Sequence, residues 1–281
     1  MQDKDGHMDP AALMRRYLAD RGDVYDELYV MAASIPDTVH LIHEMAGYVL
    51  VNRNIAKPDQ VLSGQLRELI ATCLLASKDE RHFAASHIRR LYRWGITDRA
   101  ILEAAECVAP IFGHSTILHV AGSIALANDP SYRFGAMPEG GAPTTITPFP
   151  EMETAEEPAA APQSLIDEAE WQYALSVDPE YARRVAALAD QCSGSPPRAD
   201  RLLNPAIRAL IAVPAACARG LQGLAAQHIR YAYACGFSER QIMEAVSVAT
   251  NMTGAASATI GLRAMMQVRD QMAAPAMSPA R

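Results

Sequence analysis

A carboxylate and several histidines gather in the first half of the chain, where they could move protons. Glu68 lies 19 residues before His87, and His82 lies five residues before it. Imidazole and carboxylate groups are the side chains that enzymes use most often as general acids and bases. Six of the eight histidines fall between residues 40 and 119, so this half is the candidate catalytic half.

A second histidine pair could bind a metal. His40 and His43 are three residues apart and are followed by Glu44. That spacing places both imidazoles on one face of a helix. An isolated H-x-x-H is weak evidence for a metal ligand pair, so we predict neither a metal nor a cofactor.

The elements that must position these groups are helices. Apolar residues recur at helical spacing in four consecutive segments, 66–77, 83–94, 99–111 and 115–127. Aromatic residues make up 6% of the chain, hydrophobic residues make up 50%, and alanine is abundant. This composition favours closely packed helices over a sheet sandwich. We therefore expect an all-α protein.

Charge and cysteine usage narrow the class of protein. A net charge of −7 argues against a general nucleic-acid binder, which needs a basic face. The five cysteines form no C-x-x-C pair, and their odd number suits a reducing compartment. The sequence shows no apolar signal core and no apolar run of membrane length. We expect a cytoplasmic protein that acts on a small molecule and binds neither nucleic acid nor membrane.

The chain contains an internal duplication. A shift of 141 residues places His87-Ile88-Arg89 on His228-Ile229-Arg230 and Gly95 on Gly236. Residues 128–163 interrupt the pattern and hold seven of the eighteen prolines, which is typical of a linker. The expected parts are an N-terminal helical repeat, a linker, a degenerate second repeat and a tail, at 1–127, 128–163, 164–270 and 271–281.

The two repeats act as controls for each other. His87 keeps a histidine counterpart in His228, whereas the other candidate residues do not. Glu68, His82, His114 and His119 correspond to Ala209, Gly223, Ala255 and Ile260. Because the second repeat is expected to fold without these groups, we interpret them as candidate catalytic or binding residues and not as residues that the fold requires.

The first repeat contains the pattern R-E-L, followed by H-I-R-R and G-I-T, and the second repeat contains a variant of it. This pattern resembles that of the carboxymuconolactone decarboxylase family, which includes the alkyl hydroperoxidase D proteins. The resemblance covers roughly residues 60–125 and 200–265. It implies an all-α fold and cyclic oligomers. A two-repeat chain would then form a homotrimer or another small ring that imitates a ring of six units.

The resemblance also excludes one chemistry at this site. The hydroperoxidase branch uses C-x-x-C-x-x-x-H, and the two cysteine positions before His87 hold Glu80 and Phe83. The equivalent positions before His228 hold Leu221 and Leu224. Thiol peroxidase chemistry is therefore not expected. Glu68 and His82 match a glutamate and a histidine that accompany the cysteines in that branch.

The family resemblance implies a cofactor-independent lyase. It would decarboxylate a small organic acid, or cleave a related C–C or lactone bond, by acid–base catalysis. Glu68 would be the general base or would orient His87, and His87 would protonate the substrate carbon with help from His82. The residues expected to bind the substrate are Phe83, Arg89, His114 and His119. Phe83 stands where the decarboxylase branch usually has a charge, so an apolar or aromatic substrate is plausible.

Other interpretations remain open at this point. The same groups would serve an isomerase or a lactone hydrolase. The protein could also be a non-catalytic helical scaffold or ligand-binding protein, with Glu68 paired to Arg67 or Arg89 and His228 bonded to the backbone. An enzyme requires Glu68, His82 and His87 around one cavity, which we expect to be centred on His87.

Overall fold

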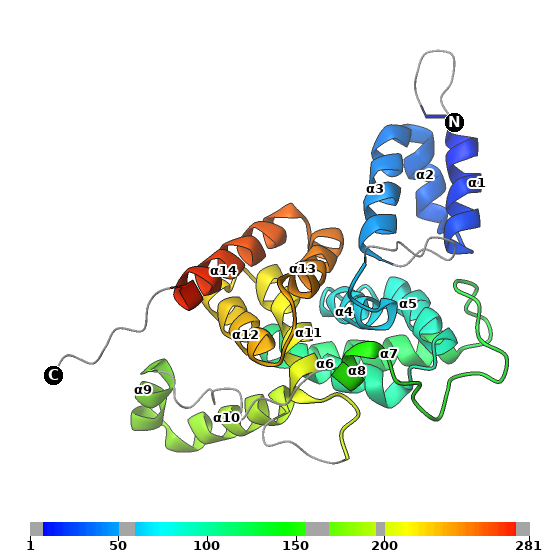
Figure 1. Ribbon diagram of the computed structural model, residues 1–281. Coiled ribbons are helices and arrows are strands. Elements are labelled where there is room, and N and C mark those ends of the chain that lie inside the picture. The colour runs from blue at the N-terminus through cyan, green and yellow to red at the C-terminus, as the bar shows by residue number, and fades with distance from the viewer. Residues whose placement is uncertain (1–7, 51–59, 155–168, 195–199, 274–281) are drawn as a thin grey trace.

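The computed structural model describes residues 8–50, 60–154, 169–194 and 200–273. Regular secondary structure within these ranges is helical, as the composition predicted (Figure 1). None of the helices described there is both long and apolar enough to cross a membrane.

Four helices form the first helical unit, and they coincide with the four segments predicted from apolar spacing. The unit consists of α4 (Gly64–Ser77), α5 (Arg81–Arg93), α6 (Asp98–Phe112) and α7 (Ser115–Asn128). The hydroxyl groups of Ser63 and Thr97 cap α4 and α6 by accepting backbone N–H bonds. Such caps satisfy donors that the first helical turn leaves free.

Four further helices form the second helical unit. It consists of α11 (Pro205–Ala218), α12 (Gln222–Ala234), α13 (Glu239–Thr253) and α14 (Ala255–Ala273). The bounds of α11, α12 and α13 are those of α4, α5 and α6 shifted by 141 residues. Helix bounds therefore follow the same register as the sequence correspondence.

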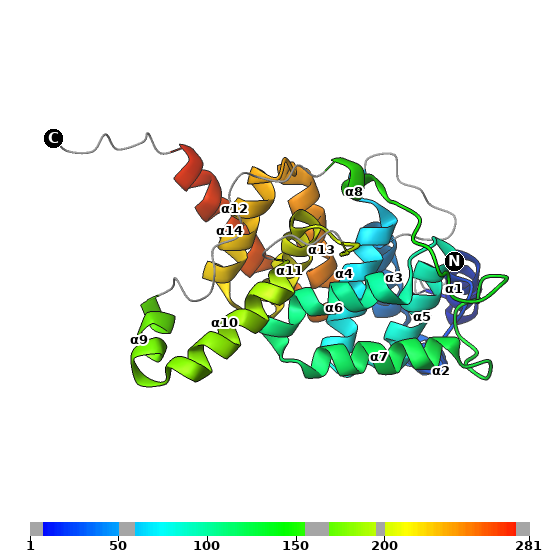
Figure 2. The same ribbon diagram turned by 90° about the horizontal axis from the view of Figure 1, so that it is seen from below.

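The remaining helices flank these two units. They are α1 (Pro10–Arg21), α2 (Asp26–Ser34), α3 (Pro36–Val49), α8 (Pro150–Thr154), α9 (Ala169–Val177) and α10 (Pro179–Ser193). The first three stand together beside the first unit around a small core of their own, and α9 and α10 extend beside the second unit (Figure 1). Seen from below, α10 slopes toward one end of α6 (Figure 2), and the two helices are in contact.

The two units are joined by reciprocal contacts of two buried glutamates. Glu103 on α6 accepts hydrogen bonds from the backbone N–H groups of Leu202 and Leu203, just before the second unit. Glu244 on α13, its counterpart, accepts them from Val61 and Leu62, just before the first unit. A carboxylate of each unit thus accepts hydrogen bonds from the backbone segment that leads into the other unit. These bonds fix the orientation of the two units relative to each other.

The described part of the expected linker packs on the first unit. Phe149 is 1% exposed, and the Glu151 carboxylate accepts a bond from the backbone N–H of Ser63 at 2.6 Å. Thr147 donates its N–H to the carbonyl of Gly95, and a Cβ at Gly95 would collide with the Thr147 side chain. Gly95 also has φ +76°, so this turn requires glycine for two reasons.

Candidate functional site

Glu68 and His87 meet in the interior of the first unit. Glu68 lies on α4 and is fully buried, and His87 lies on the facing side of α5. The Glu68 carboxylate contacts Nδ1 of His87 through one oxygen. Its other oxygen accepts a hydrogen bond from the Arg90 guanidinium at 2.6 Å. The expected catalytic pair is therefore in direct contact, and its partner arginine is Arg90, not Arg67 or Arg89.

The charges around Glu68 keep it ionised. Burial alone would raise its pKa, but the charges and hydrogen bonds of Arg90 and His87 outweigh burial and lower the pKa to about 2. An ionised carboxylate can only accept hydrogen bonds, so Nδ1 of His87 must carry the proton. Nε2 of His87 then points away from the carboxylate, and the His87 side chain is 13% exposed.

A second arginine approaches the same cluster from α1. Arg21 is 9% exposed and lies within electrostatic range of Glu68 and Arg90. Its Nε and Nη2 atoms are buried and have no hydrogen-bond partner among the described residues. Unpaired buried donors are costly, so this guanidinium is a candidate group for holding an anion.

His82 and Phe83 lie in an aromatic cluster beside this pair. The His82 ring packs edge-on against Tyr25, Tyr132 and Phe134, with centroids 4.8 to 5.7 Å apart. Phe83 packs edge-on against Tyr25 at 4.6 Å. Within the described residues, no hydrogen bond joins the exposed His82 side chain to Glu68 or His87. His82 and Phe83 thus border the site without joining its polar centre.

The Arg89 guanidinium forms its hydrogen bonds with backbone carbonyl groups. It is 6% exposed, and its guanidinium donates to carbonyl groups between Ala127 and Gly135 at 2.6 to 3.3 Å. It therefore holds the segment that follows α7, and these carbonyls occupy the guanidinium that was expected to bind the substrate.

His114 and His119 lie apart from each other. His114 is exposed at the start of α7, where its side chain makes no capping bond. His119 donates from Nδ1 to the Ala76 carbonyl at 3.0 Å, and its Nε2 lies 3.6 Å from Asp79. No contact in the described structure brings either histidine to Glu68.

The pair His40 and His43 does not form a metal cluster in the described residues. Nε2 of His43 lies 2.8 Å from Asp20, and Glu44 forms an ion pair with Arg16 at 2.6 Å. No group of three or more metal-binding side chains occurs in the part of the chain that the structure describes.

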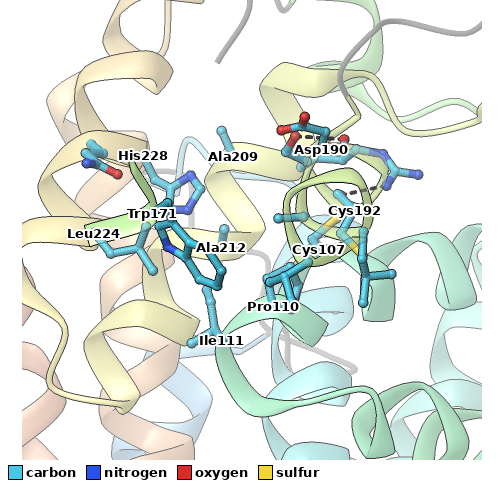
Figure 3. Close-up of a pocket in the computed structure, with 16 residues that line it drawn as sticks. Cys107, Pro110, Ile111, Trp171, Asp190, Cys192, Ala209, Ala212, Leu224 and His228 are labelled. Atoms are coloured by element: carbon cyan, nitrogen blue, oxygen red, sulfur yellow. Dashed lines mark hydrogen bonds between the residues drawn. The ribbon is translucent and has the colours of Figure 1, made fainter. Parts of the chain in front are cut away.

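The corresponding position of the second unit holds a cavity. A space of about 260 Å³ lies between α6, α9, α10, α11 and α12, beside His228 (Figure 3). Ala209 lines it at the position that Glu68 occupies in the first unit, and Leu224 lines it at the position of Phe83. We expected a pocket centred on His87. This cavity instead adjoins His228, the counterpart of His87 in the second unit.

The five cysteines are buried. All five are free thiols. Burial raises the pKa of Cys107 to about 12 and that of Cys192 to about 11. Since the thiolate is the reactive form, these side chains are poor nucleophiles at neutral pH.

The sequence patterns missed Arg90 and Arg21. Arg90 could have been found from the repeat comparison, because its counterpart is Tyr231 and it lies three residues after His87, on the same helical face. Arg21 lies in α1, outside the repeated segments, so no pattern in the chain linked it to Glu68.

Comparison with known proteins supports the fold. The sequence matches no protein-family model and no curated protein. The crystal structure of a candidate gamma-carboxymuconolactone decarboxylase subunit from Burkholderia xenovorans LB400 matches with a TM-score of 0.55 and 19% identity, over 95% of this chain and 99% of that one. The chain therefore has the all-helical fold of a carboxymuconolactone decarboxylase-like protein.

Proposed function

We propose that the protein is a cofactor-independent enzyme that transfers protons at Glu68 and His87, acting as a lyase on a small organic acid. The observation that carries this proposal is the contact between the buried Glu68 carboxylate and Nδ1 of His87. A carboxylate in this position fixes the imidazole tautomer and stabilises the imidazolium ion that forms on protonation. The name of the structural neighbour suggests decarboxylation as the reaction.

His87 is the group that exchanges protons with the substrate. Its Nε2 takes a proton from the substrate or returns one to the carbon that develops negative charge. Glu68 orients the ring, and Arg90 holds Glu68 ionised through the bond at 2.6 Å. The same sequence of proton transfers would serve isomerisation or lactone cleavage.

Arg21 is the proposed anchor for the substrate carboxylate. Its buried Nε and Nη2 atoms lack partners among the described residues, and it lies within electrostatic range of Glu68. This role falls to Arg21 and not to Arg89, because backbone carbonyls already occupy the Arg89 guanidinium. His82 and Phe83 would form the wall beside the Glu68–His87 pair. His114 and His119 would contact only parts of the substrate that lie away from this pair.

Deuterium exchange tests the acid–base assignment before the natural substrate is known. The protein is incubated in deuterated buffer with 3-oxo acids and carboxylated lactones, while NMR follows exchange at the acidic carbon and loss of carbon dioxide. Glu68→Gln should lower the rate at least roughly a hundredfold. Glu239→Gln, at an exposed position on α13, is the matched control.

The outcomes separate enzyme from scaffold. A folded Glu68→Gln variant that exchanges as fast as the wild type would contradict the assignment. Failure of the wild type to exchange or decarboxylate any of these acids would favour the non-catalytic scaffold instead.

We also propose that the protein is a homotrimer or another small ring. Large apolar side chains on α2 and α3 support this, since Val30 is 69% exposed and Leu41 is 67% exposed. Exposed apolar side chains in such a group are typical of an interface. Light scattering should give a multiple of the chain mass, and Leu41→Glu should reduce it. A stable wild-type monomer at micromolar concentration would contradict the proposal.

A further inference from the structure

The cavity of the second unit is built mainly from apolar side chains. Trp171 and Leu224 lie on the same side as His228, and Pro110 and Ile111 come from α6 of the first unit (Figure 3). Ala209 and Ala212 line it from α11 and leave the space open. The cavity therefore lies between the two units and takes walls from both.

Its size suits a small ring. The volume is about 260 Å³. An apolar protein cavity of about 150 Å³ is known to bind benzene. One substituted ring therefore fits here with room for an additional substituent.

The polar side chains that line the cavity are Asp190, Ser193, Arg208, Gln227 and His228. Arg208 lines it, but its guanidinium is already bonded to Glu103, Glu106 and backbone carbonyls. His228 has no hydrogen-bond partner among the described residues, and Ala209 stands where a carboxylate would otherwise charge it. Burial lowers the pKa of His228 to about 4, so at neutral pH the ring is uncharged and can accept a hydrogen bond.

We propose that this cavity is a binding site, separate from Glu68 and His87, for a small uncharged ring compound whose hydroxyl group donates a hydrogen bond to His228. A phenol is the simplest member of that class. An anion is disfavoured, because no unpaired cation lines the described cavity. This proposal does not depend on the proposed enzymatic activity.

Calorimetric titration with phenol and with toluene tests the site in the full-length protein. Phenol should bind saturably and more tightly than toluene. His228→Leu should reduce that preference by about fivefold, the usual weight of one neutral hydrogen bond. Trp94→Phe leaves Trp171 as the remaining tryptophan, and phenol should then change its fluorescence with the same midpoint.

Filling the cavity provides the matched comparison. Ala209→Leu should weaken phenol binding by about tenfold or more, because the added side chain occupies the space of the ring. Ala256→Leu, on an exposed turn of α14, adds the same group elsewhere and should leave binding unchanged. Leu224→Trp is a second filling variant, for use if Ala209→Leu does not fold by circular dichroism.

The outcomes either support or overturn the site. The absence of saturable phenol binding, or equal binding of phenol and toluene by the wild type, would overturn it. So would unchanged phenol affinity in a folded filling variant. Deuterium exchange at the Glu68 site, measured in the same variants, should stay unchanged, so failure of the cavity proposal can be distinguished from failure of the enzymatic one.

Discussion

The two helical units place a histidine at the same point of the same helix and surround it differently. In the first unit, Glu68 and Arg90 occupy the positions beside His87. In the second unit these positions hold Ala209 and Tyr231, and a cavity adjoins His228. One helical framework can therefore hold either a charged cluster or an apolar space, depending on a few side chains. The backbone fixes where a site can be, and the side chains decide its chemistry.

The largest expected effect is on stability. Glu68→Ala should destabilise the fold by about 3 kcal/mol or more, because it leaves Arg90 buried without its carboxylate partner and removes a negative charge near Arg21. Adding Arg90→Tyr reproduces the pair found in the second unit and should recover at least about half of that loss. Urea unfolding measures both values. Equal stability of Glu68→Ala and the wild type would show that the charged cluster does not hold the first unit together.

The two histidines should differ in activity. His87→Asn removes the proposed proton carrier and should lower deuterium exchange at least roughly a hundredfold. His228→Asn should leave the exchange rate nearly unchanged, since Ala209 gives His228 no carboxylate. A strong effect of His228→Asn beside a weak effect of His87→Asn would place the active half in the second unit.

The histidine of the second unit should make folding sensitive to mild acid. His228 has a pKa of about 4 in the fold, against 6.5 for an unperturbed histidine. The unfolded chain therefore binds its proton first, so stability falls as the pH drops from 6.5 towards 4. His228→Leu should remove this part of the pH dependence in urea unfolding. His114→Leu, at an exposed position, should not.

Glu68 should make folding stability depend on pH in a more acidic range than His228 does. Its pKa of about 2 lies below the ordinary value of 4.5, so its stabilisation is present above pH 4.5 and is lost as the pH falls towards 2. Glu68→Gln should remove that acid-dependent loss. A pH dependence identical to that of the wild type would mean that Arg90 and His87 do not stabilise the carboxylate.

The smallest expected effect is that of the cysteines. Cys107→Ala with Cys192→Ala should leave deuterium exchange unchanged, because both thiols are buried and neither contacts Glu68 in the described structure. Loss of exchange without loss of fold would show that a thiol takes part in the chemistry.

The helices and the contact between Glu68 and His87 could be predicted because they rest on local or repeated patterns. Apolar spacing predicted α4, α5, α6 and α7, and the fold places Glu68 against His87. The role of Arg89 was misjudged, because its partners are backbone carbonyls about 40 residues away in sequence. Carbonyl groups leave no signature in the side chains, so no pattern could have shown that they gather around one guanidinium.

The sequence by itself determined the helical class, the register of 141 residues between the units and the absence of a cysteine pair at the motif, since each depends on residue type and spacing alone. The tertiary structure decided which arginine meets Glu68, that Arg21 arrives from α1, and that a cavity opens beside His228. These features depend on how distant helices pack. A buried charge pairs with an opposite charge that the fold brings close, and a space stays open where small side chains such as Ala209 and Ala212 stand beside neighbouring helices. Both outcomes are settled only when the chain is folded.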